Sequence, residues 1–197
     1  MPYYTTIMDT QIKTFSFFLL DVFKIVVIAL AIVLPIRYFL FQPFVVKGAS
    51  MEPNYHTGDY LIVDEISYRF HTPERGDVIV FKYPYNPADR YIKRVIGLPG
   101  ETVEIKDGQI YVSENGKVSI LNESGYLSDD FIKTWKNLDN TSPVTLKEGQ
   151  YFVLGDNRNA SSDSRRWGIL PEQNIIGRSA LQVSLPEFLG GLVAPSY

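Results

Sequence analysis

The sequence contains no cysteine, which excludes disulfide bonds, zinc sites with thiolate ligands and cysteine nucleophiles. Histidine is nearly as scarce, and two scattered imidazoles cannot form a histidine-rich metal cluster. His56 and His71 both lie in polar, turn-like segments, where a surface position is the ordinary expectation. The charge balance, 19 Lys and Arg against 22 Asp and Glu, gives a formal net charge of −3 and argues against a nucleic-acid partner. These absences leave serine and lysine as the remaining candidates for chemistry.

Apolar residues are concentrated near the N-terminus, where residues 15–46 carry only three charges. The uncharged stretch within them, 25–36, has 12 residues and is shorter than the ~20 that a bilayer-spanning helix needs. Apolar flanks extend it on both sides, and Lys24 and Arg37 have long side chains that reach toward opposite interfaces. This pattern predicts one transmembrane helix over 17–40, with a buried core helix as the alternative. The basic residues are balanced across this segment, so they leave its orientation open.

Beyond this segment, β-rich runs alternate with turn signals, which predicts a mostly β, mainly antiparallel domain. The expected strands are Tyr60–Asp64, Val78–Tyr83, Tyr91–Gly97, Thr102–Ile105, Gln109–Ser113, Tyr151–Gly155 and Ser179–Leu185. Between two of them, Asp107-Gly108 is a strong signal for a two-residue hairpin turn. The connections between runs are expected to contain Pro84, Pro87, Pro99, Pro143 and Pro171. The best helical candidate is Ser128–Leu138, with Ser128 as its N-cap.

The expected domain organisation follows from these signals. It consists of a short tail (1–16), a transmembrane helix (17–40), a β domain in two parts (41–113 and 150–188), a polar peripheral insertion (114–149) and a C-terminal tail (189–197).

Serine and lysine chemistry requires a particular setting for each residue. A lysine acts as a base only when it is neutral, so it must be desolvated, and the serine should lie on a tight turn. Lys93 lies in an apolar strand, and because it is next to Arg94 the two side chains point to opposite faces. Ser50 lies in Gly48–Pro53, whose small residues allow a substrate backbone to approach closely. The alternatives are an edge-strand lysine that discourages aggregation and an ordinary turn serine.

Motifs around these two residues occur in a specific order along the chain. They are Gly48–Pro53, Gly58–Val63, Arg75–Phe81, Tyr91–Gly100 and Gly155–Arg165, followed by Trp167-Gly168 and Gly177-Arg178. Over about residues 15–185, this set resembles type I signal peptidases, the membrane-bound Ser/Lys endopeptidases of bacteria. The resemblance implies that Ser50 is the nucleophile and that Lys93 is the general base. The supporting residues that it implies are a serine that orients the lysine amine and two buried ion pairs: Ser161, Asp163 with Arg165, and Arg94 with Asp156.

Two extended segments flank the expected dyad and suit an added peptide strand between them. By the resemblance, the substrates are signal peptides of preproteins, cut after small residues in an Ala-x-Ala pattern. The candidates for the pocket walls, with ordinary core packing as the alternative, are Phe44, Val46, Met51, Tyr91 and Ile92. The backbone N–H of Ser50 is the expected oxyanion donor. Gly48 stands where some relatives carry a serine that provides a second donor, so that second donor is not assigned.

The resemblance also implies a location and a set of partners. It places the chain in the cytoplasmic membrane as a single-pass protein, with its tail inside and its β domain outside. Membrane lipid and the protein export machinery are the expected neighbours, and no metal or cofactor is expected. Two other functions stay open: a soluble Ser/Lys self-cleaving regulator, and a membrane-tethered β module that binds a partner without catalysis.

Overall fold

The structure is a computed structural model that describes residues 17–33, 41–134 and 140–184. The chain divides into two compact units, Met1–Phe41 and Gln42–Tyr197. In the first unit, residues 17–33 form an α-helix along which the large apolar side chains are exposed. Asp21 and Lys24 form an exposed ion pair on this helix, with Nζ 3.1 Å from Oδ1.

The predicted membrane span, 17–40, extends past the end of this described helix. Within the described residues, no helix has both the length and the hydropathy needed to cross a membrane. Residues 34–40 of the predicted span lie outside the described residues, as do the predicted tails 1–16 and 189–197.

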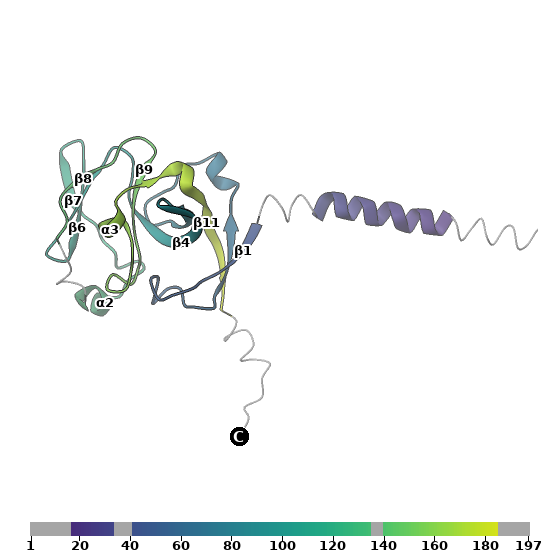
Figure 1. Cartoon of the computed structure of the whole chain (residues 1–197), viewed down its shortest axis with the longest axis horizontal. Coiled ribbons are helices and arrows are strands. Elements are labelled where there is room, and N and C mark those ends of the chain that lie inside the picture. The colour runs from purple at the N-terminus through teal and green to yellow at the C-terminus, as the bar shows by residue number, and fades with distance from the viewer. Residues whose placement is uncertain (1–16, 34–40, 135–139, 185–197) are drawn as a thin grey trace, which may run out of the picture. The chain divides into compact units, whose positions relative to one another are not determined.

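The second unit is built from β-strands, and those of its described part form two sheets (Figure 1). The larger sheet has the order β1-β2-β11-β3-β4-β9-β10, and its strands are β1 (Phe41–Val45), β2 (Tyr60–Asp64), β3 (Val78–Tyr83), β4 (Asn86–Gly97), β9 (Gln150–Leu154), β10 (Leu170–Pro171) and β11 (Ile175–Val183). The smaller sheet has the order β7-β6-β5-β8, and its strands are β5 (Thr102–Lys106), β6 (Gln109–Glu114), β7 (Lys117–Ile120) and β8 (Val144–Thr145). Short helical elements connect the strands: α2 (Asp129–Thr134), α3 (Ser164–Trp167), and the 3-10 turns η1 (Ser67–Arg69) and η2 (Glu172–Asn174).

Around β4 and β9, both faces of the larger sheet are buried. Successive side chains of a strand point to opposite sides, so each of these strands contributes to two apolar clusters. On β9, Phe152 and Leu154 pack with the apolar side chains of β5 and β6, whereas Tyr151 and Val153 pack on the opposite side with Trp167. A third apolar cluster lies under β1, β2 and β3 and consists of Val46, Leu61, Val63 and Val80.

The predicted fold class, a mostly antiparallel β domain, is confirmed by these sheets. β2 and β3 have the predicted bounds, and the predicted Asp107-Gly108 turn joins β5 to β6. Both turn residues have positive φ, 50° and 70°, as a two-residue hairpin turn of this kind requires.

Some predicted boundaries are wrong. β4 begins at Asn86, not Tyr91, so Pro87 lies within a strand; its first five residues are exposed, and proline is tolerated near the end of a strand. Pro171 likewise lies in the two-residue β10. β11 begins at Ile175, four residues before the predicted start, because its first residues pair with β3 before the strand continues along β2. The strands β1, β7, β8 and β10 and the helix α3 were not among the predicted elements.

The predicted helix Ser128–Leu138 is present as α2, which covers its first part. The Ser128 hydroxyl accepts a hydrogen bond from the Phe131 N–H at 3.3 Å, as expected for an N-cap. Residues 135–139 lie outside the described part of the chain, so the C-terminal half of the prediction falls beyond it.

Candidate active site

Ser50 lies in a tight turn between β1 and β2, and backbone hydrogen bonds tie the ends of this connection together. The Val46 N–H donates to Asp59 O (2.9 Å), and the Gly58 N–H donates to Val46 O (3.0 Å). The Ser50 carbonyl accepts a hydrogen bond from the Asn157 N–H at 3.1 Å, which joins the turn to the segment after β9. The serine is therefore presented by a backbone that is fixed from two sides.

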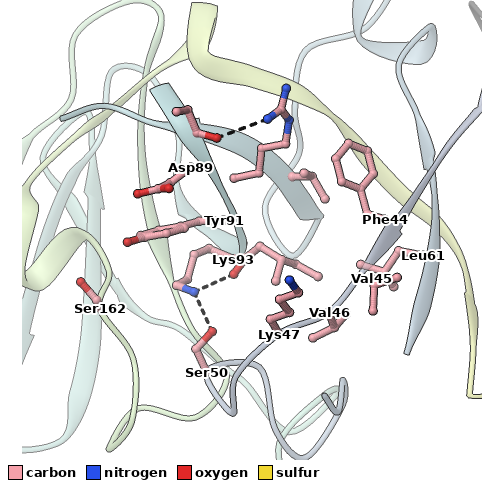
Figure 2. A pocket seen from close by; sticks show the side chains of 14 residues that line it. Phe44, Val45, Val46, Lys47, Ser50, Leu61, Asp89, Tyr91, Lys93 and Ser162 are labelled. Atoms are coloured by element: carbon pink, nitrogen blue, oxygen red, sulfur yellow. Dashed lines mark hydrogen bonds between the residues drawn. The ribbon is translucent and has the colours of Figure 1, made fainter. Parts of the chain in front are cut away.

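Lys93 lies on β4, where it pairs with Ile79 of β3. The residue is only 3% exposed, and its Nζ lies 2.8 Å from Ser50 Oγ (Figure 2). The amine also donates a hydrogen bond to the Ile92 carbonyl (2.7 Å) and lies 5.6 Å from the centre of the Tyr91 ring. The fold thus brings together the two residues, 43 positions apart in sequence, that the sequence analysis selected.

The environment of Lys93 favours a neutral amine. Burial lowers the pKa of Lys93 to about 8, although the negative charges of Asp163 and Asp156 act in the opposite direction. A neutral amine has a lone pair, so at this distance it can accept the proton of the Ser50 hydroxyl. The pair therefore has the geometry and the electrostatics of a nucleophile with its base.

Behind the pair, two buried carboxylates hold arginine side chains. Asp163 caps the N-terminus of α3 and accepts hydrogen bonds from the Gly155 N–H (3.1 Å) and from Arg165 Nε (2.8 Å). Asp156 is fully buried and accepts hydrogen bonds from Arg94 Nε (2.8 Å) and Nη2 (2.6 Å). These contacts fix the loop 155–165 beside Ser50.

Gly155 is required by the close approach of this loop to the serine turn. A Cβ at this position would collide with the Ser161 hydroxyl and with the Ser50 carbonyl oxygen, so a larger residue would push the two segments apart. Ser161 therefore lies against the same glycine as Ser50. Ser161 is 4% exposed, and its Oγ has no hydrogen-bond partner within the described residues; the expected bond to the Lys93 amine is not among its contacts.

A groove with a volume of about 530 Å³ opens in front of the pair. It is lined by Phe44, Val45, Val46, Lys47, Ser50, Leu61, Val80, Ala88, Asp89, Arg90, Tyr91, Ile92, Lys93 and Ser162. The floor is apolar, because Leu61 and Val80 of the third apolar cluster line it together with Ile92. Of the five predicted pocket residues, four line this groove. Met51 does not, because it is fully buried within the serine turn.

A segment of the predicted insertion reaches the site from the smaller sheet. Arg158, which lies in the loop 155–165, is buried and its Nη1 donates a hydrogen bond to the buried Glu123 carboxylate at 2.9 Å. Tyr126 lies under Arg94, whose guanidinium carbon is 4.0 Å from the ring centre. The Tyr126 carbonyl accepts a hydrogen bond from Asn54 Nδ2, in the serine turn, at 2.9 Å. Tyr126 thus contacts the serine turn and β4, which carry the two members of the pair, whereas Glu123 contacts the loop 155–165 beside them.

Comparison with known proteins gives a family for this arrangement. Residues 19–184 match the family model described as "Signal peptidase, peptidase S26", which covers well over half of the chain. The chain belongs to the signal peptidase family, peptidase S26. Membership in this family confirms the function predicted from the sequence, which is the removal of signal peptides by a serine endopeptidase.

Individual signal peptidases align with most of the chain. The chain is 39% identical to signal peptidase I of Bacillus amyloliquefaciens over 158 residues (79% of this chain and 80% of that protein). It is 38% identical to signal peptidase I V of Bacillus subtilis over 160 residues (77% and 90%), and 37% identical to signal peptidase I of Leptolyngbya laminosa over 185 residues (90% and 85%). A crystal structure of a signal peptidase I from Enterococcus faecalis has 36% sequence identity and a TM-score of 0.43, covering 55% of this chain and 97% of that chain.

Several groove residues of this signal peptidase were not selected from the sequence. Leu61 and Val80 belong to strands that look like ordinary core, and only their packing in one apolar cluster places them under the groove. Lys47, Asp89 and Arg90 lie at its edges, and isolated charges of this kind carry no signal in the sequence. In the described part of the chain, no group of three or more His, Asp or Glu side chains is arranged to hold a metal ion.

Proposed function

We propose that this signal peptidase cleaves its substrates with Ser50 as nucleophile and Lys93 as general base. The observation that carries the proposal is the 2.8 Å separation between Ser50 Oγ and the buried Lys93 amine at the end of a groove. Lys93 takes the hydroxyl proton as Oγ attacks the carbonyl of the last signal-peptide residue. It then gives this proton to the leaving amine of the mature protein.

The second half of the reaction uses the same two residues. Water attacks the acyl-enzyme formed on Ser50, Lys93 accepts a proton from that water, and the proton returns to Oγ as the ester bond breaks. The Ser50 backbone N–H donates to no acceptor among the described residues and is our candidate for stabilising the developing oxyanion. Asp156 and Asp163 support the site by fixing Arg94 and Arg165.

The groove supports a preference for small residues. A peptide lying as an extended strand between residues 44–47 and 91–93 would point alternate side chains at the apolar floor. Small side chains at the last and third-last positions of the signal would fit this floor without displacing Ile92 or Phe44. We propose that these two positions account for cleavage after Ala-x-Ala.

We further propose that residues 17–40 anchor the chain in the cytoplasmic membrane, with the tail 1–16 inside and the β domain outside. The proposal is supported by the exposed apolar side chains along residues 17–33 and by the apolar sequence that continues to residue 40. The catalytic domain would consist of residues 41–113 and 150–188, with 114–149 inserted between them. Membrane lipid and the export machinery are the partners that such an anchor would bring close.

The pH dependence of cleavage tests the proposed base. Only the neutral form of Lys93 accepts a proton, and burial lowers the pKa of Lys93 to about 8. We expect kcat/KM for an Ala-Gln-Ala peptide to rise with pH, to level off above about 8, and to fall about tenfold per unit well below that value. Thermal unfolding at each pH controls for loss of the fold. A profile that stays flat from pH 9 to about pH 6 would contradict the assignment.

Ser161 is our candidate for positioning the Lys93 amine, and its substitution gives a second test. The support is a buried hydroxyl, for which the described residues provide no hydrogen-bond partner, at the place where the serine turn meets the loop 155–165. We expect Ser161→Ala to lower kcat by about 10- to 100-fold, as for the loss of one hydrogen bond in the transition state, with KM and Tm nearly unchanged. The exposed Ser124→Ala provides a matched control. Wild-type kcat in both variants would reduce Ser161 to a loop residue.

A further inference from the structure

The edges of the groove are charged, although its floor is apolar. Lys47 lies on one side, three residues before Ser50, and Arg90 lies on the other, three residues before Lys93. Figure 2 shows the Lys47 side chain directed toward the interior of the groove, across from β4. The groove thus presents a cation close to the nucleophile.

Backbone alternation explains why Lys47 lies at the edge and not on the floor. Phe44 and Val46 pack into the third apolar cluster with Leu61 and Val80, so they point inward. The residues that alternate with them, Val45 and Lys47, do not belong to this cluster and are exposed at the edge of the groove. The side chains of a bound signal peptide alternate in the same way. Its last and third-last residues then face the floor of the groove, and the residue between them faces the edge.

Lys47 has no partner of opposite charge in the part of the chain that the structure describes. None of the ion pairs formed by the described residues includes Lys47. On the other side of the groove, the Asp89 carboxylate accepts a hydrogen bond from Asn86 Nδ2 at 2.9 Å, and Arg90 Nη1 lies 3.4 Å from the Ala88 carbonyl oxygen. The edge that contains Lys47 therefore carries a positive charge that no carboxylate among the described residues pairs with.

We propose that Lys47 is a specificity-determining residue. It favours signal peptides whose next-to-last residue, at the middle position of Ala-x-Ala, is acidic. The proposal rests on the proposed function, because it takes the peptide's orientation from attack by Ser50. The Lys47 amine attracts a carboxylate at this position and repels a lysine there. Because the contact is exposed to solvent, its effect is modest and depends on salt.

The experiment uses the full chain in detergent and three peptides that differ only in this middle residue, Ala-Glu-Ala, Ala-Gln-Ala and Ala-Lys-Ala. In the wild type we expect kcat/KM to be about 1.5- to 5-fold higher for the Glu peptide than for the Gln peptide, and lower by a similar factor for the Lys peptide. The differences should lie mainly in KM, because the contact is the same in the bound substrate and in the transition state. Adding salt to about 1 M should bring the three values together.

Two substitutions and one control separate Lys47 from the rest of the surface. In Lys47→Gln the three peptides should be cleaved with nearly equal kcat/KM, and in Lys47→Glu the order should reverse. Lys117→Gln, which removes an exposed lysine on β7 of the smaller sheet, should keep the wild-type order. An unchanged order in Lys47→Glu, or equal values in the wild type at low salt, would overturn the inference. Either result would leave the Ser50–Lys93 assignment intact, because cleavage of the Gln peptide reports that pair independently.

Discussion

Replacing Ser50 with alanine is expected to abolish measurable signal-peptide cleavage while the protein stays folded. Among the described residues, the Ser50 hydroxyl is the one nucleophilic group that contacts the Lys93 amine. The distance between Ser50 Oγ and Lys93 Nζ is 2.8 Å. Losing the nucleophile in a serine hydrolase lowers kcat by about 10⁶-fold, which is below the detection limit of an ordinary peptide assay. The measurement is cleavage of an Ala-Gln-Ala peptide, together with thermal unfolding of the same sample.

Ser124→Ala is the matched control, because Ser124 is an exposed serine of the same chain and lies outside the groove. It should be as active as the wild type. The Ser50 carbonyl and its bond from the Asn157 N–H are backbone groups that alanine retains, so Tm should change little. Activity within tenfold of the wild type in Ser50→Ala would show that another group attacks the substrate.

Lys93→Arg is expected to be nearly as damaging although it keeps a positive charge. Arginine does not lose its proton at any working pH, so it cannot accept one from Ser50. We expect kcat to fall on the order of 10⁴-fold, the upper range for loss of a general base. Cleavage over a range of pH is the appropriate measurement, since raising the pH should not restore activity in this variant.

Two further variants keep this prediction testable if the larger arginine disturbs the fold. Lys93→Met replaces the buried amine with an apolar side chain of similar length; it should be equally inactive and at least as stable as the wild type. Lys82→Arg, at an exposed position on the neighbouring strand β3, should retain full activity. An active Lys93→Arg or Lys93→Met enzyme would exclude Lys93 as the base.

The sequence was most informative where local chemistry and strand periodicity agree. Lys93 was recognisable because a lysine in an apolar strand is costly, and the structure places it 3% exposed beside Ser50. β2 and β3 were predicted with their observed bounds because turn signals flank them on both sides. The start of β4 was missed because its first residues are polar and include Pro87, whereas pairing with β3 extends the strand through them.

Other features depend on contacts between distant segments and leave no local pattern. The floor of the groove combines Leu61, Val80 and Ile92 from three strands, and only the packed sheet shows that they meet. The burial of Met51 is likewise not visible in the sequence, and neither is the Ser161 hydroxyl, for which the described residues provide no hydrogen-bond partner.

The buried contact between Glu123 and Arg158 limits how this enzyme can diverge. Arg158 carries its charge inside the protein, so a neutral residue at position 123 would remove the carboxylate that pairs with this charge, at a cost of about 3–5 kcal/mol. Replacing both residues together by apolar side chains would avoid this cost. The two positions should therefore change together during evolution, and a transplanted segment 114–149 should function only if it brings its own carboxylate to the loop 155–165.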